Sequence, residues 1–156
     1  MSKTTKSAKS ANVASTDIKS INNALSNIKT KVVIAEAPNS DNHYNCWGFT
    51  AAALGWVPDL FWMSDDQMES LLKANSRKTS KPKSGDIVVF RDGRQLEHTA
   101  IITDLNPSDN HIIHKPGCCY LEVSTEKTCK FDFPHFGDIS QYRRPKTKKV
   151  CLERVA

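Results

Sequence analysis

The spacing of apolar residues changes once along this chain, and the change restricts the fold more than any other feature of the sequence. Up to Ala74 apolar side chains recur mainly at helical intervals, most clearly in "SDDQMESLLKA". Beyond it, short apolar runs alternate with turns, and the predicted strands include "IVVF", "HTAIITD", "HIIHK", "YLEV" and "KFDF". Helices followed by an antiparallel meander predict an α+β domain.

Three helices are expected before the change in spacing. In the first, isoleucine and leucine recur at intervals of three, four and three residues between 18 and 28. The second begins after Asn42 or Asn45 as N-cap and places Cys46 in its first turn. The third opens with a capping box that starts at Ser64.

The net charge of +5 is concentrated near the N-terminus. Residues 1–31 carry six lysines against Asp17, so the rest of the chain is neutral. Residues 1–14 are basic and polar with no apolar period, which predicts a disordered basic tail. A chain of 156 residues suits a single domain, expected over 15–150, with 151–156 as its C-terminal end. Because the charge belongs to the tail, nucleic acid is not the expected partner.

The chain has no apolar run of about 18 residues, so no contact with a membrane is expected. Its first residues also lack the apolar core of a secretory signal. We expect synthesis in the cytoplasm without a signal peptide, with delivery to the periplasm or non-classical secretion left open. The odd count of five cysteines argues against a disulfide scaffold.

Cys46 has two interpretations. At a helix N-terminus the main-chain N–H groups and the helix dipole favour a reactive thiolate. Such a nucleophile needs an imidazole base and a third group to orient it. His98 opens one predicted strand and His114 closes the next, and a turn between antiparallel strands can bring them together. The alternative is that Cys46 is a small buried apolar residue.

Several short motifs, taken in order, resemble the NlpC-type and CHAP-type cysteine hydrolases of bacterial cell-wall metabolism. They are "NCWGF" at the start of a small-residue helix, "GDIVVF", a histidine before "AIITD", and "IIH" before a Pro-Gly turn, together spanning about residues 38–120. The resemblance implies a papain-like α+β fold with N-terminal helices packed on an antiparallel sheet. It makes Cys46 the nucleophile, His98 the general base and His114 the residue that orients His98. A histidine in the third position favours the NlpC-type side, whereas "NCWGF" departs from the usual Asp-Cys-Ser-Gly.

Substrate contacts are expected beside the cysteine. Tyr44 and Asn45 are candidates to complete an oxyanion hole, and Trp47 is a candidate to line a substrate groove, although core packing also suits a tryptophan. The spacing in "HIIHKPGCC" matches no closed zinc site, so neither a metal nor a cofactor is expected.

The resemblance implies a hydrolase that cleaves an amide bond through a thioester. A peptidoglycan amidase or endopeptidase is the first expectation, acting as an antibacterial toxin or a phage lytic enzyme. Its partners would be a peptide or peptidoglycan substrate and, for a toxin, a cognate inhibitor protein. A papain-like protease, deamidase or acyltransferase with a protein substrate is the alternative. A non-enzymatic binding module, whose basic tail docks on nucleic acid or on a partner, is the second alternative.

Overall fold

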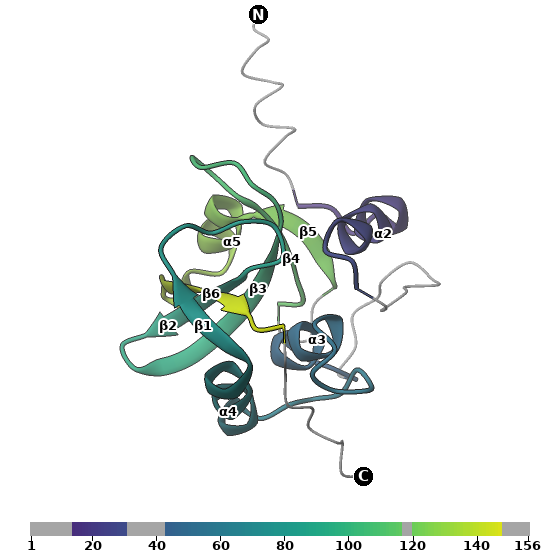
Figure 1. Ribbon diagram of the computed structural model, residues 1–156. Helices are drawn as coiled ribbons and strands as arrows, with labels where there is room; N and C mark the ends of the chain where they lie inside the picture. Colours follow the sequence, from purple (N-terminus) through teal and green to yellow (C-terminus); the bar gives the residue numbers. More distant parts are fainter. Residues whose placement is uncertain (1–13, 31–42, 117–119, 148–156) are drawn as a thin grey trace, which may run out of the picture.

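The computed structural model describes residues 14–30, 43–116 and 120–147, which form a six-stranded antiparallel sheet with helices on its two faces (Figure 1). The order across the sheet is β1-β6-β2-β3-β4-β5. The strands are β1 (Ser76–Thr79), β2 (Ile87–Asp92), β3 (Gln95–Asp104), β4 (His111–His114), β5 (Glu122–Thr125) and β6 (Asp138–Pro145). The α+β prediction is therefore confirmed. Of the expected basic tail, residues 1–13 lie outside the described residues, as does the expected C-terminal end, 151–156.

The helices begin where local capping chemistry places them. They are α2 (Ile18–Asn27), α3 (Cys46–Ala53), α4 (Asp65–Asn75) and α5 (Glu126–Asp132), followed by the 3-10 turn η1 (Pro134–Phe136). Asp17 caps α2, Asn45 caps α3, and Ser64 forms the predicted capping box with Gln67. Among the described residues, none of the helices combines the length and apolarity needed to cross a membrane.

The segment "KFDF" was expected to be a strand, and this prediction is wrong. Its first three residues lie in α5, which Thr125 caps by accepting a hydrogen bond from the main-chain N–H of Thr128. Cys129 of α5 and Phe136 of η1 then pack on the sheet. Tertiary packing and a cap thus outweigh the alternation of apolar residues.

Alternate side chains of the central strands pack on opposite faces of the sheet. On one face Ile87, Val89 and Ile101 contact the apolar sides of α2, α3 and α4. On the other face Val88 and Ala100 belong to a cluster completed by α5 and η1. The sheet therefore has two buried faces, and a residue's position along a strand decides which layer it faces.

His98 lies on the α5 face of β3, and a β-bulge next to it turns Leu96 to the opposite face. The β2–β3 register runs from Phe90 opposite His98 to Arg91 opposite Leu96, so β3 carries one extra residue there. In a regular strand Leu96 and His98 would share a face. Instead Leu96 packs in the cluster that includes α4, and the His98 ring lies 5.4 Å from that of Phe90.

Candidate active site

Asn45 fixes the first turn of α3 and with it the position of Cys46. Its Oδ1 accepts hydrogen bonds from the main-chain N–H groups of Gly48 (2.9 Å) and Met63 (3.2 Å). Its Nδ2 donates to the Met63 carbonyl at 2.8 Å. The side chain is buried and serves as both helix cap and tether. The expected role of Asn45 in an oxyanion hole stays a prediction.

Cys46 is the first residue of α3, and its thiol is buried. Burial raises the pKa of Cys46 to about 12, because desolvation disfavours the thiolate. The main-chain N–H groups of Thr99, Trp47 and Cys46 and the charge of Lys115 act in the opposite direction and are outweighed. The N–H groups at the helix start thus act as expected, but burial outweighs them, and the expectation of a lowered pKa for Cys46 is wrong. Cys46 is a neutral thiol in the free protein, and Thr99 beside it is the neighbour of His98.

This raised pKa has a measurable consequence. Only the thiolate reacts with iodoacetamide, so below the pKa its fraction rises about tenfold per pH unit. We expect the alkylation rate of Cys46, followed by peptide mass spectrometry, to keep rising through pH 10, since its pKa is about 12. An unperturbed thiol would level off above about pH 8.5. A plateau between pH 5 and 7 would contradict the prediction, because it would reveal a thiolate already present.

His98 and His114 lie within hydrogen-bond distance of each other. His98 Nε2 is 2.7 Å from His114 Nδ1, and both side chains are fully buried. Ile101 pairs with Ile113, so the same register places Ala100 opposite His114. His98 lies two residues from Ala100 on the same face of β3, and the two rings therefore meet diagonally across the sheet.

Glu122 continues the chain of hydrogen bonds. It lies opposite His114 in the β4–β5 register, and its Oε2 is 2.9 Å from His114 Nε2. An ionised carboxylate only accepts, so His114 Nε2 carries the proton and His114 Nδ1 accepts from His98 Nε2. His98 Nδ1 is then left with a lone pair, and among the described residues it has no hydrogen-bond partner. The network thus fixes His98 as a base that can accept a proton at Nδ1.

The surroundings of His98 keep it neutral and hold its ring plane. Burial lowers the pKa of His98 well below its ordinary value, with smaller contributions from His114 and His135. The Phe136 ring stacks on the imidazole with centroids 4.0 Å apart and planes 5° from parallel. The imidazole is therefore neutral and immobile, with the Nδ1 lone pair held in one direction, although its lowered pKa makes it a weaker base than an exposed histidine.

Glu122, Cys129 and Phe136 were missed from the sequence. Glu122 could have been found by pairing the strand "YLEV" against "HIIHK", which sets it opposite His114. Cys129 and Phe136 lie on either side of "KFDF" (130–133), the segment that was taken for a strand. The Cys129 Sγ is 3.9 Å from His114 Nδ1 and is also buried.

Lys115 is a further missed residue, and it supports the segment before the α3 cap. Its side chain is fully buried, Nζ donates to the main-chain carbonyl of Tyr44 at 2.8 Å, and Nζ lies 4.7 Å from the centre of the Tyr44 ring. Trp47 is partly buried against the cluster that includes α4. The predicted substrate contacts of Tyr44 and Trp47 stay predictions.

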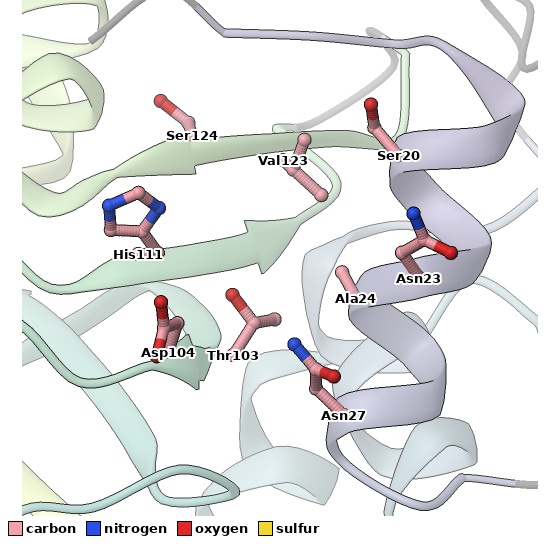
Figure 2. A pocket seen from close by; sticks show the side chains of 9 residues that line it. All are labelled: Ser20, Asn23, Ala24, Asn27, Thr103, Asp104, His111, Val123 and Ser124. Atoms are coloured by element: carbon pink, nitrogen blue, oxygen red, sulfur yellow. The ribbon is translucent and has the colours of Figure 1, made fainter. Parts of the chain in front are cut away.

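A polar pocket of about 320 Å³ lies elsewhere, between α2 and the strands β3, β4 and β5 (Figure 2). Asn23 and Asn27 of α2 face Asp104 and His111 across it. Cys46, His98 and His114 do not line this pocket. The candidate active site is therefore separate from it.

Comparison with known proteins adds the family. Residues 37–115 match the family model described as the CHAP domain, a range that includes Cys46, His98 and His114. The chain belongs to the CHAP domain family. The sequence motifs resembled two families, the CHAP type and the NlpC type. His114 in the third catalytic position had favoured the NlpC type. CHAP domains are hydrolases of the amidase or peptidase type.

Glu122, Cys129 and Phe136 lie beyond the residues that match the CHAP model. A search of curated proteins finds no match. Among solved structures, the chain is similar to one titled "The crystal structure of Ly7917", with 15% identity and a TM-score of 0.42. The similarity covers 81% of this chain and 62% of that one.

Proposed function

We propose that this CHAP hydrolase cleaves an amide bond through a thioester on Cys46, in a papain-like arrangement of a helix-borne thiol and a strand-borne imidazole. One observation carries the proposal: the Glu122–His114–His98 chain of hydrogen bonds leaves His98 Nδ1 as a buried acceptor without a partner among the described residues. Two contacts tie Cys46 and its helix to Thr99, the residue that follows His98 on β3. The main-chain N–H of Thr99 hydrogen-bonds the Cys46 thiol. A hydrogen bond of 2.9 Å between Thr50 of α3 and Thr99 of β3 ties the helix to the strand beside His98.

The first half of the reaction forms the thioester. The Cys46 thiol transfers its proton to His98 Nδ1 as the sulfur attacks the amide carbonyl carbon. Main-chain N–H groups of Cys46 and Trp47, which already oppose the rise in the thiol pKa, stabilise the oxyanion. The imidazolium of His98 then gives its proton to the leaving amine, and the C–N bond breaks.

The second half regenerates the enzyme. Water attacks the thioester carbonyl while His98 Nδ1 takes one of its protons. The C–S bond breaks, the carboxylic acid leaves, and the proton returns to the sulfur of Cys46. Throughout, His114 and the Glu122 carboxylate stabilise the charge that appears on His98.

Bacterial peptidoglycan stem peptides are the substrate that we propose. The support is the family and the resemblance of the sequence motifs to cell-wall hydrolases. An antibacterial toxin or a phage lytic enzyme is the corresponding biological role, and a toxin would be paired with a cognate inhibitor protein. Delivery to the periplasm or secretion by a non-classical route belongs to the same proposal.

Digestion of purified peptidoglycan tests the proposal. We expect the wild type to release fragments whose masses report cleavage of one amide bond in the stem peptide, and Cys46→Ala to release none. If a thiol-directed peptide probe labels Cys46 while peptidoglycan stays intact, the substrate is another amide and the peptidoglycan assignment is wrong. If neither occurs, the hydrolase proposal itself is wrong.

A further inference from the structure

A second chemistry is available to the two histidines. One donor atom from each of His98, His114 and Cys129 lies within 4.8 Å of the other two. The three side chains are buried between the sheet and α5. Two imidazole nitrogens and one sulfur are the donors that Zn²⁺ prefers, and three protein ligands with one open position are common in zinc sites.

The distances are near those of a tetrahedral ion. Zn–N bonds of about 2.0 Å and Zn–S bonds of about 2.3 Å place two nitrogens about 3.3 Å apart, and a nitrogen and a sulfur about 3.6 Å apart. The observed separations are 2.7 Å between the imidazole nitrogens and 3.9 Å between His114 Nδ1 and Cys129 Sγ. Small rotations of the side chains reach the zinc geometry.

The surrounding groups are those that orient metal ligands. The Glu122 carboxylate binds His114 through Nε2, which leaves the lone pair of Nδ1 directed into the cluster. In many zinc sites the histidine nitrogen that does not bind the metal donates a hydrogen bond to a carboxylate. Phe136 holds the His98 ring by stacking on it.

We propose that His98, His114 and Cys129 form a zinc site in which the ion replaces the proton shared by the two imidazoles. The His98 ring proton moves from Nε2 to Nδ1, so that Nε2 binds the ion and the ring stays neutral. The Cys129 thiol loses its proton to solvent, and one proton is released per ion bound.

The ion also turns the hydrolase off. His98 Nδ1, the acceptor for the Cys46 proton, becomes a donor when zinc occupies Nε2. This consequence rests on the proposed function, whereas binding itself does not. Zinc is thus an inhibitory ligand of this chain, and Cys129 is the residue that creates its site.

Binding is tested on the full chain with zinc and with cobalt as its spectroscopic substitute. We expect one Zn²⁺ per chain by calorimetry, and a near-ultraviolet thiolate-to-cobalt charge-transfer band. Cys129→Ser should weaken zinc binding at least about tenfold and remove the band, while Glu122→Gln should weaken binding about tenfold. Cys46→Ala should keep both signals.

A control addresses the remaining thiols. In a variant carrying Cys118→Ser, Cys119→Ser and Cys151→Ser, the stoichiometry and the band should be unchanged. Loss of the band in that variant, its persistence in Cys129→Ser, or no zinc binding by the wild type would each overturn the proposal.

Inhibition is a separate measurement. The zinc concentration that halves hydrolysis should rise at least about tenfold in Cys129→Ser, and a chelator should restore the wild-type rate. An equal concentration in the two proteins would place the inhibitory ion away from Cys129 and overturn the inhibitory role. Absence of hydrolysis from every sample would instead contradict the proposed function and leave the binding result valid.

Discussion

Cys46→Ala and His98→Ala should each lower kcat for amide hydrolysis by at least about a thousandfold. The first substitution removes the sulfur that forms the thioester, and the second removes the nitrogen that takes its proton. Both groups act in the same step, so the double variant should be little worse than either single one. The measurement is the initial rate on a substrate that the wild type cleaves, with circular dichroism melting to verify folding.

Glu122→Gln separates the orienting carboxylate from the base itself. The amide oxygen of glutamine still accepts from His114 Nε2, so the proton positions survive, but the negative charge that stabilises the His98 imidazolium is lost. We expect kcat to fall on the order of a hundredfold, with KM changed little. Glu69→Gln is the matched control, because it removes a carboxylate bound to Arg91 outside the site.

Two outcomes would contradict this account in different ways. If Glu122→Gln and Glu69→Gln retain equal activity while Cys46→Ala is inactive, the nucleophile is right and the carboxylate has no catalytic influence. If Cys46→Ala keeps the wild-type rate, the thioester mechanism is wrong.

Gly48→Ala should lower the free energy of unfolding by about 3 kcal/mol or more. A β-carbon at this position would overlap the main-chain carbonyl of Phe61, where α3 packs closely on the following segment. A glycine-to-alanine change in the middle of a helix usually stabilises by about 0.5–1 kcal/mol, so the close contact reverses the sign. Urea denaturation monitored by fluorescence gives the measurement.

Gly93→Ala is the comparison for this effect. Gly93 has a φ of 64°, a backbone conformation that is strained for alanine. No atom lies within 4 Å of a β-carbon built there, so the substitution causes no steric overlap. Its expected cost is about 1–2 kcal/mol. A Gly48→Ala protein as stable as the wild type would mean that α3 and the Phe61 segment are further apart than the structure has them.

Local chemistry made the helix starts predictable. A cap involves residues three or four positions apart, and for this reason Asn45 and Ser64 could be recognised as starts of helices from the sequence. The same holds for the strands that carry His98 and His114, whose apolar runs and intervening turn are continuous in sequence. The two strand histidines and a cysteine at a helix tip were thus accessible as candidates.

Contacts between distant segments decided the rest. Pairing of β1 with β6 joins Ser76 to Pro145, and no local pattern records such a pairing. The first three residues of "KFDF" lie in a helix, and the burial of Cys129 against the sheet stabilises that helix. The alternation of apolar residues within the segment carries no information about this contact.

The features of the candidate active site also fall into those that the sequence determines and those that depend on tertiary contacts. The sequence determined which residue types stand at the start of α3 and on β3 and β4. The tertiary structure decided that Glu122 meets His114, that Phe136 stacks on His98, and that burial raises the pKa of the Cys46 thiol. Periodicity and capping act within a few residues, whereas burial, register and desolvation depend on the whole folded chain.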